Sequence, residues 1–458
     1  MLVSSEKTKI HFIGIGGIGM SGIAEVLLDL GHRVSGSDVS ASPITEHLKV
    51  KGAEIYIGHA ASNLKDVTIV VYSTAIDEKN PEIQKTKLDK IPLVRRAEML
   101  AELMRLKKGI AIAGSHGKTT TTSLVATIFH EAGLDPTHII GGIVSNLGGN
   151  ARHGKGDYLI AEADESDGSF LLLSPQLAVV TNIDNDHLDF HKTEENIRQA
   201  FIEFINRLPF FGRVALNAHD RGTQKILCEV KRPYVLFGIA EGEELNKLEY
   251  GVTNISYAPR NTEFDVYQKG SKLGRITTRI SGEHNVLNAI AAIAICHEAG
   301  LAFAQIAKGI QQFIGVGRRL ESLWKNNEFE VIDDYGHHPT EIRATLATIK
   351  QVFKKPVCVV FEPHRYSRTQ QHWQDFVTCF DGADEVFIGP IYAASEAPID
   401  GISGEKLASE LNQPQAKYLP DLESIGDLIN ERKDRNMIFL TLGAGSISKK
   451  TKSIIQKL

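Results

Sequence analysis

The chain has 458 residues, more than a single hydrophobic core normally serves, so we expect two or three domains. Hydrophobic residues make up 42% and charged residues 23% of the sequence, the balance of a soluble globular protein rather than a disordered or membrane protein. The formal net charge of -5 argues against a broad basic face, so we expect neither nucleic acid nor an anionic membrane as the main partner.

The four cysteines are scattered without CxxC spacing, which argues against zinc ribbons and disulfide frameworks and favours a reducing cytoplasm. The first residues, MLVSSEKTKIHFIGIGG, lack a basic stretch followed by a long apolar one. No window approaches the roughly 20 apolar residues of a membrane span. We therefore expect a cytoplasmic location and no membrane insertion.

Strand and helix signals alternate in the N-terminal part of the chain. Residues 9–15 predict a buried strand that runs into glycines, and an apolar-periodic helix from about Met20 to Leu30 follows. Further strands are predicted at Arg33–Asp38, Ala53–Ile57 and Thr68–Ser73. Such alternation implies a parallel sheet, and this first domain is predicted to span residues 1–107.

The same pattern begins again at residue 108. A strand at 108–115 leads through a second glycine-containing loop into a helix from about Lys118 to Ala132. The next predicted elements are strands at 158–164 and 177–183 and helices at about Glu194–Arg207 and Asn285–Ala299. Short alternating strands between about 233 and 281 predict a small antiparallel annex. This second α/β domain is predicted at 108–314.

Helical periodicity stops at IGVGRRLE (314–321), whose glycines and paired arginines indicate the next boundary. From Val331 onward, strands with the sequences VIDDYG, PVCVVFEP, DEVFIGPI and MIFLTLGAG alternate with helices. The third domain, residues 315–458, is therefore expected to be α/β as well.

The first glycine loop, GIGGIG (14–19), fits the GxGxxG pattern between a strand and a helix. Gly14, Gly16, Gly17 and Gly19 would let backbone N–H groups approach a diphosphate at the helix N-terminus. Asp38 closes the second strand, where its carboxylate can accept a ribose hydroxyl. NAD, FAD and UDP-sugars all suit this loop, and glycines kept only for tight packing are the alternative.

The second loop, GSHGKTTT (114–121), ends in the Gly-Lys-Thr of a phosphate-binding loop, although the full GxxxxGK[ST] spacing is not present. Lys118 would reach the β- and γ-phosphates of ATP, and the Thr119 hydroxyl would ligate Mg²⁺. Two phosphate loops on separate domains predict two phosphate-bearing substrates, whereas a nicotinamide-dependent dehydrogenase needs only the first loop.

Eight separated motifs, in order along the chain, resemble those of the Mur ligase family. They are FIGIGGIGMSGIA (12–24), GSHGKTTTT (114–122), EADESD (162–167), TNIDNDHLD (181–189), GEHNVLNA (282–289), GVGRR (315–319), DDYGHHPTE (333–341) and FEPHRYSRT (361–369). The resemblance covers essentially the whole chain and points to the branch that joins L-alanine to UDP-N-acetylmuramate.

The resemblance implies three domains. These are a Rossmann-like domain for UDP, a central P-loop ATPase-like domain with a parallel sheet, and a C-terminal Rossmann-like domain that closes over the amino acid. It also implies the reaction, in which the lactyl carboxylate of the muramoyl sugar attacks the γ-phosphate of ATP, giving an acyl phosphate and ADP. The amine of L-alanine then attacks the acyl carbon, and phosphate leaves.

For the central domain, the resemblance implies that Thr119, Glu162 and His187 ligate Mg²⁺ while Lys118 neutralises charge on the γ-phosphate. The residues alone leave other interpretations open, because Glu162 is one of several acids and a lone histidine is more often a polar surface group. Several family relatives carry a carbamylated lysine after the DH motif. Residues 193–206 contain no lysine, so a second metal site depends mainly on His187.

The resemblance also assigns the ATP-binding residues. The phosphates would be held by Gly114, His116, Gly117, Lys118, Thr119 and Thr120. His284, Asn285 and Asn288 would contact the adenine edge, although Asn285 can equally cap the helix that begins there. Arg318 and Arg319 would reach the ATP phosphates when the domains close.

Arg365 and Arg368 lie three positions apart after a strand, so a helical turn would place both on one side. Two guanidinium groups suit the carboxylate of an amino acid, and pairing with surface acids is equally compatible with the spacing. By resemblance, Tyr335 and His337 line the same pocket. We also expect His337 to help deprotonate the incoming ammonium.

Other interpretations remain open on the sequence. A sibling ligase that attaches a murein tripeptide to the same sugar nucleotide would share these motifs, and a folate-type polyglutamate ligase would share the ATP-binding core without a UDP-binding domain. A dehydrogenase that uses residues 12–38 leaves Lys118 unexplained. A non-catalytic nucleotide-binding regulator would bind ATP without amino-acid-dependent phosphate release.

Overall fold

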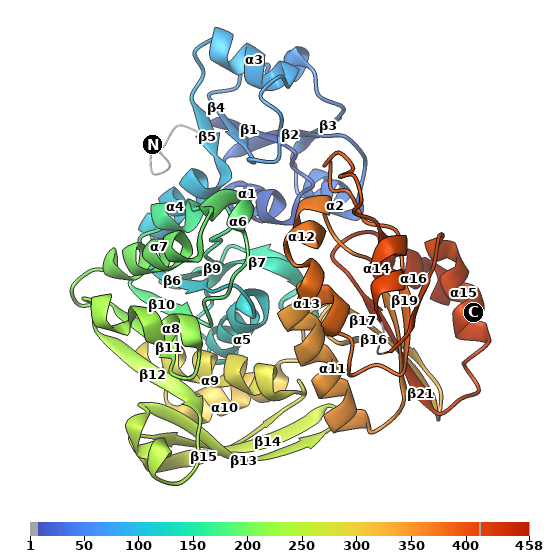
Figure 1. Cartoon of the computed structure of the whole chain (residues 1–458). Coiled ribbons are helices and arrows are strands. Elements are labelled where there is room, and N and C mark those ends of the chain that lie inside the picture. Colours follow the sequence, from blue (N-terminus) through green and yellow to red (C-terminus); the bar gives the residue numbers. More distant parts are fainter. Residues whose placement is uncertain (1–7, 412–413, 458) are drawn as a thin grey trace. The chain divides into compact units, whose positions relative to one another are not determined.

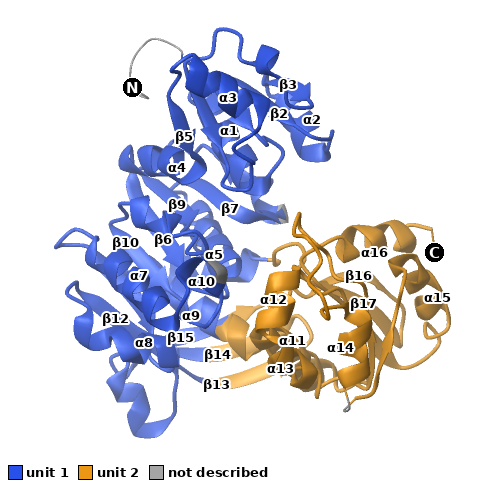
Figure 2. Ribbon diagram, turned by 45° about the horizontal axis from the view of Figure 1, so that its top comes forward, with its two compact units in different colours: residues 1–253, 265–276, 287–313 blue, residues 254–264, 277–286, 314–458 orange. Residues whose placement is uncertain are grey.

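The computed structural model describes residues 8–411 and 414–457. Residues 1–7, on which part of the expectation about the N-terminus depends, lie outside the described residues. The chain divides into two compact units, which Figure 2 colours separately. The first unit comprises residues 1–253, 265–276 and 287–313, and the second comprises residues 254–264, 277–286 and 314–458.

The N-terminal sheet is parallel, with the strand order β3-β2-β1-β4-β5 (Figure 1). Its elements are β1 (Lys9–Ile13), α1 (Ile18–Asp29), β2 (Arg33–Asp38), α2 (Pro43–Val50), β3 (Glu54–Ile57), η1 (Ala61–Asn63), β4 (Ile69–Tyr72), α3 (Pro81–Leu88), β5 (Leu93–Arg95) and α4 (Arg96–Arg105). The predicted parallel sheet is confirmed. The strand order reverses between β1 and β4, so the loop after β1 lies at the switch point where such sheets bind ligands.

The central sheet has the strand order β15-β14-β13-β12-β11-β10-β6-β9-β7-β8. Its first elements are β6 (Lys108–Ala113), α5 (Lys118–Glu131), β7 (Thr137–Val144), η2 (Ser145–Leu147), β8 (Gly149–Arg152), β9 (Tyr158–Glu162), η3 (Ser169–Leu172), β10 (Leu177–Val180), α6 (Leu188–His191) and α7 (Glu194–Asn206). The later elements are β11 (Arg213–Asn217), α8 (Arg221–Ile226), η4 (Leu227–Glu229), β12 (Tyr234–Ile239), η5 (Gly242–Lys247), β13 (Tyr250–Ala258), β14 (Asn261–Gln268), β15 (Ser271–Thr278), α9 (Glu283–Glu298) and α10 (Phe303–Gln312). The helices predicted after residues 117, 193 and 284 are therefore all present.

The predicted antiparallel annex is wrong for its first strand. β12 pairs in parallel with both β11 and β13, so it extends the parallel run of the central sheet. The annex pattern begins one strand later. Two residues separate β13 from β14, and two separate β14 from β15, and connections this short join antiparallel neighbours.

The third sheet has the order β16-β17-β21-β18-β19-β20 and lies wholly in the second unit. Its elements are β16 (Glu321–Lys325), β17 (Phe329–Asp334), α11 (Pro339–Phe353), β18 (Val357–Phe361), α12 (Tyr366–Gln371), α13 (Trp373–Thr378), β19 (Glu385–Ile388), α14 (Gly404–Glu410), β20 (Ala416–Tyr418), η6 (Leu422–Ser424), α15 (Ile425–Asn430), β21 (Met437–Leu442) and α16 (Ile447–Ile455). Among the described residues of this sheet, β16 pairs antiparallel with β17, and the pairs β17–β21, β21–β18, β18–β19 and β19–β20 are parallel. The α/β prediction for this region is confirmed.

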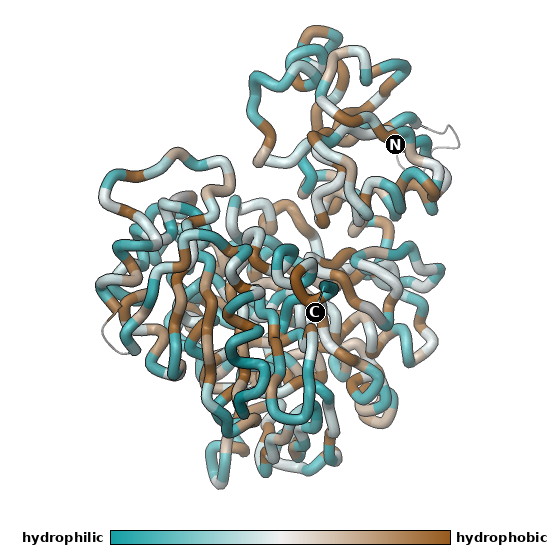
Figure 3. Tube along the Cα trace, turned by 90° about the vertical axis from the view of Figure 1, so that its right-hand side faces the viewer, coloured by the Kyte–Doolittle hydropathy of each residue, from teal (hydrophilic) through white to brown (hydrophobic). Residues whose placement is uncertain are grey.

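The strands before the two glycine loops, and two strands in the middle of the third sheet, are almost wholly buried. β1, β18 and β21 have no exposed residue, and β6 is buried after its first lysine. Figure 3 colours the trace by hydropathy and shows hydrophobic and hydrophilic stretches alternating along the chain. Strands that are buried on both sides of a parallel sheet need a layer of helices over each face. Among the described residues, no helix has the length and apolar character needed to cross a bilayer.

Candidate active site

The loop between β6 and α5 adopts a backbone that requires glycine at two positions. Gly114 has a φ of 129°, and a Cβ atom there would lie 2.0 Å from Thr181 Oγ1. Gly117 has a φ of 83° and caps α5, and a Cβ atom there would lie 2.3 Å from Asn288 Oδ1. A side chain at either position would therefore strain the loop and displace its neighbour.

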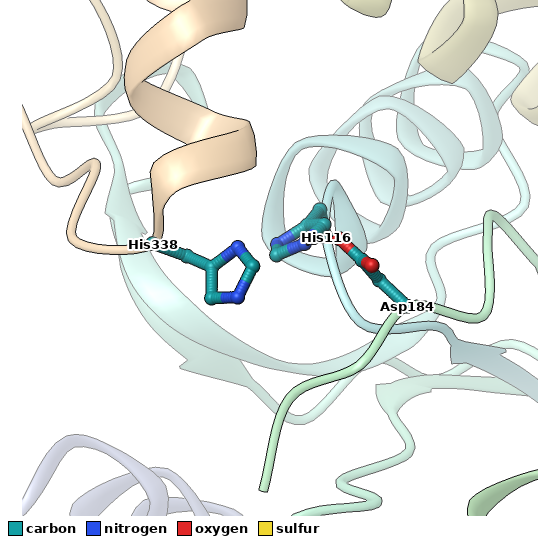
Figure 4. Close-up of side chains that lie close together, drawn as sticks. All are labelled: His116, Asp184 and His338. Atoms are coloured by element: carbon teal, nitrogen blue, oxygen red, sulfur yellow. Dashed lines mark hydrogen bonds and ion pairs between the residues drawn. The ribbon is translucent and has the colours of Figure 1, made fainter. Parts of the chain in front are cut away.

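Residues 181–184, which follow β10, hold this loop through hydrogen bonds. His116 N donates to Asn182 Oδ1 at 2.9 Å, and Thr181 Oγ1 donates to the His116 carbonyl at 2.6 Å. The imidazole of His116 lies beside Asp184, with 2.9 Å between Nε2 and Oδ2 (Figure 4). The third side chain in that picture, His338, belongs to the second unit. Backbone and side chains of residues 181–184 thus fix the shape of the loop.

Lys118 begins α5, and its side chain folds back over the loop. Its Nζ donates to the carbonyl oxygens of Gly114 at 2.6 Å and Ser115 at 3.2 Å, and to Glu165 Oε1 at 2.7 Å. The side chain of Lys118 is 17% exposed and that of Glu165 only 2%. The ammonium group is therefore held at the N-terminal end of a helix, where anions are favoured.

Three of the four acids of EADESD act on this ammonium. Burial alone would lower the pKa of Lys118, but the negative charges of Glu165, Asp164 and Glu162 raise it above its usual value. Burial raises the pKa of Glu165 to about 7 although Lys118 opposes the shift. The pair thus sits in a site where charge is costly unless it is balanced.

His187 and Glu162 lie in the same unit as the loop. His187 has a left-handed φ of 59°, and its Nε2 is 3.8 Å from Glu165 Oε1 and 3.4 Å from Asp186 Oδ2. Glu162, at the end of β9, accepts a hydrogen bond from Gly141 N at 2.6 Å. Carboxylate and imidazole groups therefore gather near Lys118, and these are groups that divalent cations accept as ligands.

The first turn of α5 contacts α9. Thr121 Oγ1 donates to Asn288 Oδ1 at 3.3 Å, and Asn288 also lies against Gly117. Thr120 is buried and Thr119 is half-buried. Asn288 therefore helps to position the loop that carries Lys118. This is a second role, in addition to the contact with adenine that was predicted for it.

The loop after β1 is supported differently. Gly14 N and Ile15 N donate to the Ser37 carbonyl at 2.8 and 3.0 Å, and Gly16 N donates to Asp38 Oδ2 at 2.9 Å. Gly17 caps α1, and Gly16 and Gly17 are at least partly accessible. This loop carries no cationic side chain, so an anion would depend on backbone N–H groups and the helix dipole.

Arg96, at the start of α4, links this first loop to the acid run. A Cβ atom at Gly19 would lie 3.2 Å from Arg96 Nη1, and Arg96 Nη2 is 3.2 Å from Asp164 Oδ2. The sequence did not single out Arg96, because an arginine outside a motif carries no signal of its own.

In the second unit, two arginines flank Tyr335. The guanidinium carbons of Arg318 and Arg319 lie 4.7 and 5.0 Å from the centre of the Tyr335 ring, and Tyr335 N donates to the Arg318 carbonyl at 2.7 Å. Arg318 Nη2 donates to the Gly443 carbonyl at 2.6 Å. The GVGRR and DDYGHH motifs are thus brought together by cation–π and backbone contacts.

His337 and the two predicted carboxylate-binding arginines meet around His364. His364 lies 5.8 Å, centre to centre, from the His337 ring, stacks on Tyr392, and has its Nδ1 3.4 Å from Arg368 Nη1. Burial, followed by Arg368 and Arg365, lowers the pKa of His364 to about 4. The imidazole is therefore neutral at pH 7. His364 was not among the site residues predicted from the sequence. Its place within the FEPHRYSRT motif is the signal that could have identified it as one.

Arg365 has a left-handed φ of 68° and lies 4.0 Å from Glu396, measured from Nε to Oε1. Elsewhere in this unit, His284 is within hydrogen-bond distance of Thr348, with 3.3 Å between Nδ1 and Oγ1. Asn285 Nδ2 donates to the Ser281 carbonyl at 2.8 Å, so its side chain bonds to the backbone at the start of α9. His284 and Asn285 fall in the second unit, whereas Asn288, predicted to act with them, falls in the first.

Three family models match successive parts of the chain. The model described as "Mur ligase family, catalytic domain" matches residues 9–108, "Mur ligase middle domain" matches residues 112–296, and "Mur ligase, glutamate ligase domain" matches residues 318–445.

Curated relatives match nearly the full length. The UDP-N-acetylmuramate--L-alanine ligase of Trichlorobacter lovleyi is 48% identical, with 98% of this chain and 99% of that protein covered. The protein of the same name from Geobacter sulfurreducens is 49% identical, with 98% and 97% covered.

Among solved structures, the UDP-N-acetylmuramate-alanine ligase of Thermotoga maritima aligns with a TM-score of 0.83 and 31% identity over 98% of both chains. A murein peptide ligase from Psychrobacter arcticus aligns with a TM-score of 0.73 and 23% identity over 98% of both chains, a likeness that concerns the fold.

Proposed function

Because the chain belongs to the Mur ligase family, we propose that it uses ATP to join L-alanine to the lactyl carboxylate of UDP-N-acetylmuramate, in the cytoplasm. The observation that carries the proposal is the position of Lys118, half-buried at the start of α5 and directly after a loop whose Gly114 and Gly117 admit no side chain. In addition, relatives at 48–49% identity over nearly the whole chain bear the name of this activity.

The first step is phosphoryl transfer to a carboxylate. A carboxylate oxygen of the sugar attacks the γ-phosphorus, and ADP leaves. Both reactants are anionic, so catalysis needs cations where charge spreads over the γ-oxygens. The Lys118 ammonium binds and orients the phosphates, and the N–H groups at the start of α5 add positive potential.

A divalent cation fits the groups around Lys118. Glu165 Oε2 is buried without a hydrogen-bond partner among the described residues, and hydroxyl, carboxylate and imidazole groups lie in the same unit. Thr119, Glu162 and His187 would hold Mg²⁺, which when bound supplies further charge neutralisation at the phosphates. Residues 193–206 hold no lysine, so carbamate ligation from this helix is not part of the proposal.

The second step forms the amide bond. The alanine nitrogen loses a proton and attacks the acyl carbon, and phosphate leaves. Arg365 and Arg368 would bind the alanine carboxylate, with Tyr335 and His337 beside them. The neutral His364 ring between His337 and Arg368 supports this pocket, because an imidazolium there would repel the ammonium of the substrate.

The remaining assignments follow the three sheets. We propose that residues 1–107 bind the UDP part through Gly14, Gly16, Gly17, Gly19 and Asp38. Residues 108–314 would bind ATP through the Lys118 loop, with Gly114, His116 and Thr120 around the phosphates and Asn288 beside them. Residues 315–458 would bind alanine, and Arg318, Arg319, His284 and Asn285 would complete the nucleotide contacts.

The test is phosphate release from ATP with Mg²⁺ and UDP-N-acetylmuramate, with one candidate amine added at a time. We expect release to require the sugar nucleotide and to be fastest with L-alanine. Faster release with the murein tripeptide would identify the sibling ligase instead. If the chain binds ATP but phosphate release does not depend on an amine, the chain is a nucleotide-binding protein and not a ligase.

A further inference from the structure

Lys118 has no hydrogen-bond donor to spare for a phosphate. An ammonium group has three donors, and the structure uses them on Gly114 O, Ser115 O and Glu165 Oε1. Two of these acceptors are neutral carbonyl groups of the loop itself, whereas the third is an oxygen of the Glu165 carboxyl group. A bound phosphate would therefore compete with Glu165 for the same ammonium.

Glu165 is held firmly from its backbone. Its carbonyl oxygen accepts from Gly168 N at 3.0 Å and lies 2.8 Å from His191 Nε2, and the His191 side chain is buried. The backbone of Glu165 is therefore fixed, and its side chain is almost wholly buried. Its second oxygen, Oε2, is buried and has no hydrogen-bond partner among the residues that the structure describes.

A buried carboxylate needs a positive charge nearby. Lys118 supplies it here, and His187 Nε2 lies 3.8 Å from the oxygen that Lys118 binds. If Lys118 turns to a phosphate, the charge on Glu165 must be balanced by another cation. The divalent cation that accompanies a nucleoside triphosphate is that cation, and Oε2 offers it a free oxygen.

We propose that Glu165 is a positioning residue that holds Lys118 until nucleotide binds, and that it ties nucleotide affinity to the divalent cation. Phosphate displaces the Glu165 carboxylate from Lys118, and the cation compensates the released carboxylate. Without the cation, the phosphates must displace Glu165 and leave it unbalanced. This inference depends on the proposed function only in that Lys118 contacts the phosphates.

The test measures dissociation constants of a non-hydrolysable ATP analogue by calorimetry, once with Mg²⁺ and once with a chelator. In Glu165→Gln, Lys118 is released from its competitor, so affinity without Mg²⁺ should rise about tenfold, within the usual range of coupling between sites. With Mg²⁺ the gain in affinity should be smaller. The ratio of the dissociation constant without Mg²⁺ to that with Mg²⁺ should therefore be lower in Glu165→Gln than in the parent chain. A purely structural role for Glu165 predicts the opposite sign, because a misplaced lysine would weaken binding in both conditions.

Asp167→Asn is the matched control, since it removes a charge from the same loop while its carboxylate bonds to Ser169 N and Thr74 rather than to Lys118. Its Mg²⁺ dependence should equal that of the parent chain. Affinity of Glu165→Gln no higher than that of Asp167→Asn without Mg²⁺ would overturn the proposal. If Glu165→Gln does not fold, Glu165→Asp takes its place, because it draws the carboxylate back from Nζ and should also tighten Mg²⁺-free binding. If Mg²⁺-free affinity is unchanged in Glu165→Asp, the proposal is also overturned.

Lys118→Ala separates this inference from the proposed function. If it binds the analogue as tightly as the parent chain, Lys118 does not hold the phosphates, and the function proposed above fails at that point. If it binds weakly while Glu165→Gln matches its control, the phosphate contact stands and only the exchange with Glu165 is wrong.

Discussion

The loops after β1 and β6 both connect a buried parallel strand to a helix, yet they are built for different tasks. In the first, Gly16 N and Gly14 N donate to Asp38 and to the Ser37 carbonyl, and residues 14–19 themselves include no cationic side chain. In the second, Lys118 faces acidic side chains. The first loop suits an anion that is only bound, whereas the second suits an anion whose charge distribution changes during reaction.

The largest difference between the loops should appear on removal of Lys118. Lys118→Ala should lower phosphate release by about a thousandfold or more, because the ammonium offsets charge on the transferred phosphate. Steady-state phosphate release with all three substrates measures this effect. Lys155→Ala, which removes an exposed lysine of the same unit, serves as the control and should keep the parent rate. An unchanged rate in Lys118→Ala would mean that the second loop is not the site of phosphoryl transfer.

The two loops should also differ in their tolerance of alanine. Gly114→Ala combines a φ of 129° with a Cβ 2.0 Å from Thr181 Oγ1, so it should lower kcat about a hundredfold by displacing the loop. Gly16→Ala has no positive φ to strain, and its Cβ meets the end of the Asp38 side chain at 2.8 Å and Thr45 Cγ2 at 3.1 Å. It should mainly raise the KM for the sugar nucleotide, about tenfold. Equal losses of kcat in both variants would contradict the division of tasks.

The sequence was sufficient to predict the strands before the two glycine loops, the helices after them, and the parallel sheets, because buried strands and glycine-to-helix transitions leave local patterns. It was insufficient for contacts made over long separations. Glu165 was only one acid among several in EADESD, and its pairing with Lys118 depends on β6 and β9 lying side by side. β12 was misjudged because a short strand shows no sign of whether its neighbour runs parallel.

A second contrast concerns the support beneath each loop. Beneath the first loop, the side chains of Ser37, Asn63 and His11 contact the carboxylate of Glu82. Ser37 Oγ donates to Glu82 Oε2 at 2.5 Å, and Asn63 Nδ2 donates to Glu82 Oε1 at 2.7 Å. His11 Nε2 lies 3.5 Å from Glu82 Oε1. Burial alone would raise the pKa of Glu82, but these polar contacts outweigh it and lower the pKa from 4.5 to about 2.

This carboxylate should make the N-terminal sheet sensitive to acid. Since the folded pKa lies below the unfolded value, the stabilisation is complete above about pH 4.5 and is lost as pH falls toward 2. It amounts to about 3 kcal/mol at most. Urea unfolding of the parent chain and Glu82→Gln at pH 7, 4 and 3 measures it, and the gap between the two should narrow with falling pH. A gap that stays constant would show that the Glu82 charge contributes nothing.

The smallest effect is expected at Asp38, whose carboxylate has two possible tasks. Oδ2 holds Gly16 N, and the proposed function adds a ribose hydroxyl. Asp38→Asn keeps an acceptor but loses the charge, so the KM for the sugar nucleotide should rise about tenfold while kcat and the KM for ATP stay constant. Competition by UDP and by 2′-deoxy-UDP separates the tasks. If Asp38 contacts the 2′-hydroxyl, the variant should lose affinity for UDP but little for the deoxy compound, whereas equal losses would mean that Asp38 makes no contact with the 2′-hydroxyl.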